Sequence, residues 1–262
     1  MKKRDVICRV CAIVSVLIFA VVWFWNPILS SDETAQLLYR SVIFRGLGSI
    51  VFVFVLLYQE FHVMSRPRVS HLAVFLPSLA VAINNFPILG YAQGTVQLER
   101  GDLLWVYALD CLMIGAFEEL AFRGVFLPSL LSRYGRDQKQ LRLTVILSSA
   151  AFGLIHLVNM AEGAGVGATL LQVGYSFLIG GMCAIVLVKT GNLLYCILLH
   201  GVYDFGGRFL TIGSGRLWDT PTVIITAVLA VVVTAWMLKV FFELTPKEGE
   251  RLYRKKRKGE IG

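Results

Sequence analysis

The sequence predicts an all-α integral membrane protein with about eight transmembrane helices. The chain has 262 residues, of which 56% are apolar and 16% are charged, and its mean hydropathy is +0.70. Soluble domains carry about 25% charged residues, so this chain has too few charged side chains to cover a water-soluble fold. The apolar excess must face lipid. This excludes an ordinary soluble domain, a disordered chain, a coiled coil and collagen.

Eight runs of roughly 17 to 24 mostly apolar residues are long enough to cross a bilayer as helices. They lie near residues 6–25, 43–59, 71–91, 104–127, 142–158, 168–188, 192–208 and 222–242. The first run follows positive charges like a signal peptide, but it has no small-residue cleavage site, so we expect a retained anchor. There is no internal repeat and no low-complexity linker. Residues 1–262 are therefore predicted to form a single polytopic membrane domain.

The placement of the basic residues predicts the orientation. With the amino terminus inside, the inner segments hold seventeen lysines and arginines, and the outer segments hold five. Such a bias is typical of cytoplasmic loops. We expect a multi-pass protein of the cell membrane with both termini in the cytoplasm. The basic tail, residues 246–262, is predicted to lie against anionic lipid headgroups; a nucleic-acid arm is the weaker interpretation, and no nucleic-acid partner is predicted.

The five cysteines all lie inside apolar segments. Cys8 and Cys11 have a spacing found in metal sites, but no second pair and no nearby histidine accompanies them. We interpret the cysteines as packing residues.

Ionisable side chains concentrate in three of the predicted spans. A charged group in hydrocarbon costs about 2.5 kcal/mol or more, so such a group is a functional hypothesis by default. The three segments read Glu118-Glu119-x-x-x-Arg123, Phe152-x-x-x-His156 and His200-x-x-x-Asp204. Asp110 is expected to contact water or to support the site, and Asn84 and Asn85 are expected to join helices by hydrogen bonds.

Helical spacing predicts that the two glutamates of the first segment lie on different faces of the helix. Glu119 and Arg123 are four residues apart and form an ion pair on one helix face. Glu118 points about 100° away and is left without that partner. A desolvated carboxylate of this kind is what a general base needs.

The other two segments supply histidines at a matching depth. If the helices of spans 104–127 and 142–158 form a hairpin, Glu118 and His156 lie at similar depth. Phe152 falls on the His156 face and limits water around it. His200 and Asp204 are four residues apart, so the carboxylate can orient or charge-pair the imidazole.

These groups together favour hydrolysis in a polar intramembrane cavity. The Glu118 carboxylate would take a proton from water, and the imidazoles would donate hydrogen bonds to the oxyanion. No serine or cysteine lies convincingly beside a base, so a covalent nucleophile is disfavoured. A zinc site of His156, His200 and Glu118 stays open, since two histidines and a glutamate are a known catalytic ligand set.

The three ordered motifs resemble those of the CPBP intramembrane protease family, which comprises CAAX proteases and bacteriocin-processing enzymes and is also called Abi. The chain looks like a type II CAAX prenyl protease of this family. Residues 117–204 form the catalytic motif core of this resemblance. It implies an eight-helix glutamate-dependent endopeptidase that requires no cofactor, with zinc possible. The implied roles are water activation by Glu118 and His156, oxyanion stabilisation by His200 and Asp204, and support from Glu119, Arg123 and Phe152.

The resemblance also sets the expected substrate and one point of departure. It implies cleavage near the terminus of a membrane-associated protein or peptide, prenylated for some family members. Asparagine is commoner than aspartate at the position of Asp204, and an ionised carboxylate cannot donate a hydrogen bond to an oxyanion. Asp204 is therefore either protonated or holds His200 as an imidazolium that donates.

Two other classes of function compete with a protease. A non-catalytic immunity or peptide-binding protein of the same fold would keep the motifs without turnover. A proton-coupled transporter would use intramembrane carboxylates as well, but it predicts internal repeats or paired broken helices. Neither feature is visible in the sequence.

Overall fold

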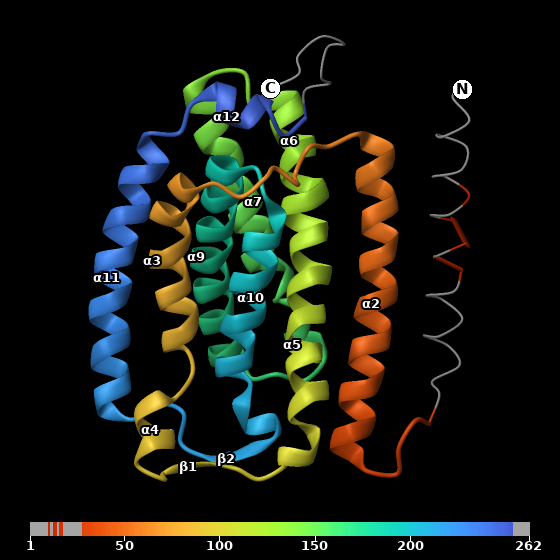
Figure 1. Cartoon of the computed structure of the whole chain (residues 1–262), viewed down its shortest axis with the longest axis vertical. Helices are drawn as coiled ribbons and strands as arrows, with labels where there is room; N and C mark the ends of the chain where they lie inside the picture. Colours follow the sequence, from red (N-terminus) through yellow and green to blue (C-terminus); the bar gives the residue numbers. More distant parts are fainter. Residues whose placement is uncertain (1–9, 11–12, 15, 18–27, 254–262) are drawn as a thin grey trace.

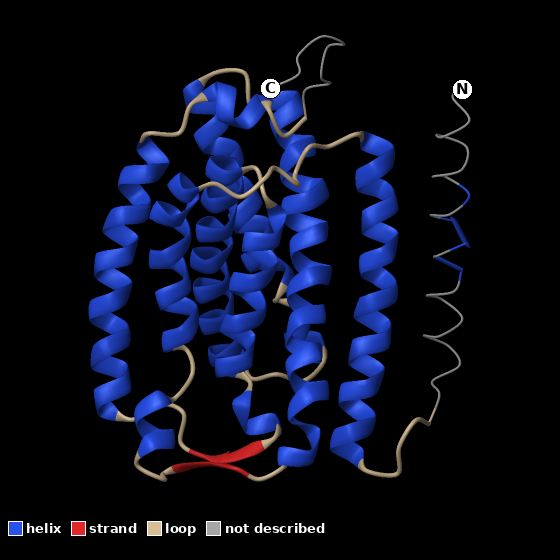
Figure 2. Ribbon diagram, viewed as in Figure 1, coloured by secondary structure: helices blue, strands red, loops and turns tan. Residues whose placement is uncertain are grey.

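The computed structural model describes residues 28–253 together with residues 10, 13, 14, 16 and 17. Most of the predicted span 6–25, including Cys8 and Cys11, and the end of the predicted tail, residues 254–262, lie outside the described residues. The described chain is a bundle of helices with one two-stranded sheet (Figure 2). The predicted all-α class is confirmed.

Long helices run side by side through the bundle, with α11 at one side and α2 at the other (Figure 1). The antiparallel strands β1 and β2 close one end together with α4, and α12 lies at the opposite end. In chain order the elements are α2 (Glu33–Gln59), η1 (Val69–His71), α3 (Leu72–Asn84), α4 (Ile88–Ala92), β1 (Val96–Leu98), η2 (Gly101–Leu103), α5 (Leu104–Glu119), the π-helical η3 (Leu120–Phe126), α6 (Leu127–Tyr134), α7 (Gln138–Ile155), α8 (Val158–Ala161), α9 (Val166–Thr190), α10 (Leu193–Gly207), η4 (Phe209–Thr211), β2 (Gly213–Gly215), α11 (Thr220–Phe242) and α12 (Pro246–Glu250).

Several of these helices have the length and composition of membrane spans. Four described segments are long and apolar enough to cross a bilayer: Glu33–Gln59, Gln138–Ala161, Val166–Thr190 and Thr220–Phe242. Two apolar segments are shorter, Val69–Asn84 and Leu193–Gly207. The helix through α5, η3 and α6 is continuous but carries the charged residues of the first motif. The membrane class is supported, and the total of eight spans stays a prediction.

Short polar side chains begin several long helices by accepting hydrogen bonds from free backbone N–H groups. Asp32, Asp137 and Asp219 cap α2, α7 and α11 in this way. At α10, Asn192 Oδ1 accepts from the N–H of Leu194 at 2.9 Å, while its Nδ2 donates to the carbonyl oxygen of Ser65 at 2.7 Å. The Asn192 cap therefore ties the start of α10 to the loop after α2.

A close approach between α5 and α10 positions the motif residues. At Gly115, a Cβ atom would lie 2.9 Å from both the backbone nitrogen of Gly201 and the carbonyl oxygen of Ile197. A larger residue would push the two backbones apart, so glycine is needed at this contact. The contact brings the carboxyl end of α5 next to the middle of α10, where His200 lies.

The third predicted span is shorter than expected. Helix α3 ends at Asn84 instead of continuing to residue 91, because the chain turns before Pro87 and forms the separate helix α4. Asn84 Nδ2 donates to Thr226 Oγ1 of α11, and Asn85 Nδ2 donates to the carbonyl oxygen of Tyr203 in α10, both at 2.7 Å. The predicted hydrogen bonds between helices are confirmed.

The described part of the predicted tail packs on the bundle. Glu248 in α12 forms an ion pair with Lys189 at 3.0 Å. Leu252 is fully buried, and its carbonyl oxygen accepts a hydrogen bond from His62 N–H at 2.7 Å. These contacts fix residues 246–253 against the end of the bundle that carries α12.

Candidate active site

The first motif lies where α5 passes into a π-helical segment. Glu118 and Glu119 end α5, and Arg123 lies inside η3. Arg123 Nη1 is 3.0 Å from Glu119 Oε1, and both side chains are fully buried. The predicted ion pair is confirmed. Single π-helical turns within α-helices are frequent at functional sites, so this irregularity agrees with the position of the motif.

Glu119 also holds His200, which the sequence did not indicate. His200 Nδ1 lies 2.9 Å from Glu119 Oε1. A carboxylate oxygen accepts, so Nδ1 carries the proton and the ring is fixed with Nε2 directed away from Glu119. Glu119 thus bridges Arg123 of η3 and His200 of α10.

The second nitrogen of His200 faces two more carboxylates. Nε2 is 3.7 Å from Glu118 Oε2 and 3.8 Å from Asp204 Oδ2. These distances are too long for direct hydrogen bonds. Spacing predicted that Asp204 would orient the imidazole, but Glu119 makes the orienting hydrogen bond. Because Nδ1–H is used on Glu119, His200 can donate to a further acceptor only through a protonated Nε2.

His156 has a defined ring orientation of its own. Its Nδ1 lies 2.9 Å from the carbonyl oxygen of Phe152, one turn earlier in α7. A carbonyl only accepts, so Nδ1 is the protonated nitrogen and Nε2 of a neutral ring keeps a lone pair. Among the described residues, no direct hydrogen bond joins His156 to Glu118.

Phe152 packs between the charged groups. It is 2% exposed, and its ring lies against His156 and His200 with centroids 5.3 and 5.8 Å away. The guanidinium carbon of Arg123 lies 4.1 Å from the same ring centroid. Phe152 therefore contacts both histidines and the buried arginine, which is more than the expected role of limiting water.

A cavity of about 1150 Å³ joins the motif residues of three helices. Glu118, His156, His200 and Asp204 line it, whereas Glu119 and Arg123 do not. The carboxylates and imidazoles predicted to be catalytic thus share one space, and the buried pair lies behind them. Apolar side chains of α7, α9 and α11 line much of the remaining wall.

Other polar residues of the cavity were not singled out by the sequence. Asn159 donates to Gln172 at 2.8 Å, and the rings of Tyr175 and Tyr203 lie 6.2 Å apart. Their positions depend on how distant helices pack, and no local motif marks them. Arg45 and Arg208 also line the cavity, and both contact Asp110. Asp110 is fully buried, so of its two expected roles, contact with water and support of the site, the support is the one that the structure favours.

The motif residues lie within a part of the chain that matches a protein-family model. Residues 100–206 match the family model described as type II CAAX prenyl endopeptidase Rce1-like. The resemblance to the CPBP intramembrane protease family is confirmed. No curated protein and no solved structure matches the chain. The matched segment runs from the start of η2 almost to the end of α10 and contains all three CPBP motifs. The match to the Rce1-like model supports a membrane-embedded protease of the CAAX type in general terms.

The predicted zinc ligands His156, His200 and Glu118 do not form a set within mutual reach of one ion among the described residues. A different set does, with potential ligand atoms within 4.8 Å of one another: Glu119, Cys183 and Cys196.

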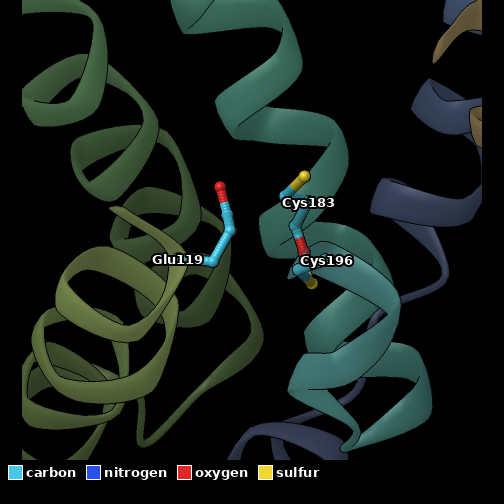
Figure 3. Close-up of side chains that lie close together, drawn as sticks. All are labelled: Glu119, Cys183 and Cys196. Carbon is cyan, nitrogen blue, oxygen red and sulfur yellow. Dashed lines mark hydrogen bonds between the residues drawn. The ribbon is translucent and has the colours of Figure 1, made fainter. Parts of the chain in front are cut away.

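Figure 3 shows Glu119 across from the two cysteines of α9 and α10. In this set, Cys196 Sγ donates to the carbonyl oxygen of Cys183 at 3.2 Å, and Glu119 Oε1 is shared by Arg123 and His200. These contacts give Cys196 and Glu119 a structural role.

Proposed function

We propose that the chain is a CAAX-type intramembrane endopeptidase, glutamate-dependent and without a required metal. It would hydrolyse a peptide bond near the terminus of a membrane-associated or prenylated protein or peptide. The observation that carries this proposal is the convergence of Glu118, His156, His200 and Asp204 on one cavity from three helices. The family match over residues 100–206 supports the same class of reaction.

Water activation is assigned to Glu118 and His156. The Glu118 side chain is 25% exposed, so its carboxylate can contact a water in the cavity. The Nε2 lone pair of His156 offers a second acceptor for the same water. As the water oxygen bonds to the scissile carbonyl carbon, Glu118 takes the proton, which later goes to the departing amine nitrogen. The peptide C–N bond then breaks, leaving a new carboxylate and a new amine.

Oxyanion stabilisation is assigned to His200 and Asp204. Glu119 fixes the His200 ring, so a protonated Nε2 is aimed at the space between Glu118 and Asp204. A donor held in place before the reaction stabilises developing negative charge without reorganisation. Asp204 either donates as a protonated carboxyl or holds the imidazolium in place. Arg123 and Phe152 support this arrangement by holding Glu119 and the two rings.

The apolar part of the cavity supports a substrate with an apolar group. Side chains such as Ile179, Met182, Leu229, Val233 and Met237 line this part between α9 and α11. The free energy of an apolar segment or an attached lipid chain falls when it leaves water and packs against such a wall. This favours a membrane-associated substrate over a soluble one.

The test compares terminal peptides released from matched membranes that contain the wild type, Glu118→Gln or Glu243→Gln. Glu243 is the control, since its side chain is 57% exposed near Lys239 and far from the motifs in sequence. We expect peptides with the wild type and Glu243→Gln that are absent with Glu118→Gln. Identical peptide sets from all three folded proteins would refute the protease. A substrate that still binds Glu118→Gln, with no turnover by the wild type, would favour the immunity or peptide-binding function.

A further inference from the structure

A second cavity, of about 410 Å³, lies between α3, α11 and α12 at the end of the bundle that carries α12 (Figure 1). Its volume is within the range of about 300–1000 Å³ that is typical of small-molecule sites. The described residues that line it differ from those that line the motif cavity. We call it the basic pocket, because Arg68, Lys189 and Arg251 line it.

The two carboxylates that line the basic pocket already have cationic partners. Glu248 Oε1 lies 3.0 Å from Lys189 Nζ, and Glu248 Oε2 accepts hydrogen bonds from the N–H and the hydroxyl of Thr245. Glu243 lies 4.0 Å from Lys239, one turn earlier in α11. Each carboxylate is therefore paired with a lysine, and neither pair includes an arginine of the pocket.

The guanidinium groups of Arg68 and Arg251 are the remaining charges of the pocket. Within the described part of the chain, no carboxylate lies at ion-pair distance from either group. Arg251 Nη2 donates to the carbonyl oxygen of Val188 at 2.8 Å, which holds this guanidinium against α9. Burial lowers the pKa of Arg251, Glu248 raises it, and the charge of Arg68 lowers it again. The two arginines thus repel each other, and an anion between them would relieve that repulsion.

Two buried nitrogen atoms of the lining also lack hydrogen-bond partners. These are His71 Nδ1 and Arg251 Nε, among the described residues, and His71 is only 7% exposed. Buried polar atoms are nearly always paired with protein groups or ordered water. A phosphate group carries negative charge and several acceptor oxygens, and guanidinium groups bind it through charge-assisted hydrogen bonds. It therefore matches both the charge and the donors of the basic pocket.

The rest of the pocket wall is apolar and adjoins the outer surface of α11. Trp236 is 38% exposed, and its Nε1 donates to the carbonyl oxygen of Ala73 at 3.0 Å, which joins α11 to α3. Val74 and Val240 complete this wall. Tryptophan is enriched where lipid headgroups meet acyl chains. Basic pockets between helices on the cytoplasmic side bind anionic headgroups, and this end of the bundle is the one that the sequence predicts to be cytoplasmic.

We propose that the basic pocket binds the phosphate of an anionic phospholipid, with Arg68 and Arg251 on the phosphate and Trp236 and Val240 along the glycerol and acyl chains. Soluble phosphate esters share the phosphate chemistry, but they would leave the apolar wall without a contact. No covalent bond forms or breaks at this site. Because the basic pocket is separate from the motif cavity, the inference does not depend on the proposed protease activity.

The test measures lipid binding to the full-length protein in detergent micelles. The probes are phosphatidylglycerol and phosphatidylcholine with the same acyl chains, brominated close to the glycerol so that they quench tryptophan fluorescence on contact. Quenching that disappears in Trp236→Phe is assigned to Trp236. The variants are Arg68→Gln, Arg251→Gln and the matched control Arg66→Gln, each made with and without Trp236→Phe. Arg66 is exposed on the same loop as Arg68 and lies outside the pocket lining.

We expect phosphatidylglycerol to quench Trp236 at about tenfold or more lower concentration than phosphatidylcholine in the wild type and in Arg66→Gln. Arg68→Gln should reduce this preference about fivefold, the effect of one basic residue near an anionic lipid. If Arg251→Gln fails to fold because the Val188 carbonyl loses its donor, Arg68→Gln carries the test. An unchanged preference in Arg68→Gln, an equal loss in Arg66→Gln, or equal quenching by both lipids in the wild type would overturn the inference.

Glycerol phosphate distinguishes a lipid from a soluble phosphate ester, since it has the phosphate but no acyl chains. At a concentration equal to that of phosphatidylglycerol, we expect it to leave the quenching of Trp236 unchanged, because it cannot contact the apolar wall. Displacement of half of the bound lipid would overturn the lipid assignment in favour of a soluble phosphate ester. None of these measurements requires peptide cleavage, so a failure of the proposed protease activity would leave their outcome unaffected.

Discussion

The buried pair of Glu119 and Arg123 allows a prediction of stability from geometry. Arg123→Met removes a guanidinium that lies 3.0 Å from Glu119 and 4.1 Å from the centre of the Phe152 ring, in a fully buried position. Breaking one partner of a buried ion pair costs about 3–5 kcal/mol, and Glu119 then keeps only its contact with His200. The contact with the Phe152 ring accounts for about 1–2 kcal/mol of that loss. We therefore expect Arg123→Met to lower the free energy of unfolding by about 3–5 kcal/mol.

A double variant isolates the charge effect. Glu119→Gln combined with Arg123→Met removes both charges but keeps an amide oxygen to accept the hydrogen bond from His200. Arg123 Nε and Nη2 and Glu119 Oε2 are buried without hydrogen-bond partners among the described residues, so the native pair is incompletely satisfied. Replacing such a pair by uncharged groups often changes the free energy of unfolding little. We expect the double variant to regain more than half of the stability that Arg123→Met loses.

The assay is unfolding by SDS titration in mixed micelles, followed by circular dichroism. Lys239→Met is the control, since Lys239 and Glu243 have the same four-residue spacing on α11 but are 61% and 57% exposed. Such an exposed pair contributes about 0–1 kcal/mol. A loss below about 1 kcal/mol in Arg123→Met, or a double variant no more stable than Arg123→Met, would refute the argument.

Three further predictions test the site and its surroundings. Asp204→Asn should keep at least a tenth of the wild-type kcat/KM because its amide can donate to the oxyanion, while Asp204→Ala should lose about 10²-fold or more; equal losses would exclude donation at this position. Incubation with a chelator should leave peptide release unchanged, and a loss that zinc restores would contradict the metal-free assignment. At the start of α2, the N–H of Ala35 and the Arg100 guanidinium lower the pKa of Asp32. That stabilisation is present above the unfolded pKa and is lost as pH falls through the lower, folded pKa, so the melting temperature of Asp32→Asn should fall less on acidification from pH 5 to pH 3 than that of the wild type.

Features set by local spacing could be predicted from the sequence. The ion pair of Glu119 and Arg123 needs one helical turn and no information on other helices. The predicted spans 192–208 and 222–242 lie within two residues of α10 and α11, since apolar runs and capping residues mark helix ends locally. The end of α3 was missed because apolar residues continue through the turn before α4.

The partner of His200 could not be predicted in the same way. Spacing favoured Asp204, four residues later, but the nearer carboxylate belongs to Glu119, 81 residues earlier in the chain. That contact depends on the close approach of α5 and α10 at Gly115. The grouping of Arg45 with Asp110 and Arg208 has the same origin, since three separate elements must meet to form it.

Two adjacent glutamates acquire different roles from helix geometry alone. Neighbouring residues on a helix point about 100° apart, so a helix that borders a cavity can direct one carboxylate into the protein and the next into the cavity. Glu119 is fully buried and holds Arg123 and His200, whereas Glu118 is 25% exposed and lines the cavity. The buried carboxylate fixes the histidine that the exposed one approaches at 3.7 Å. A carboxylate at position 119 is therefore needed for this arrangement, because that carboxylate contacts both the arginine and the imidazole.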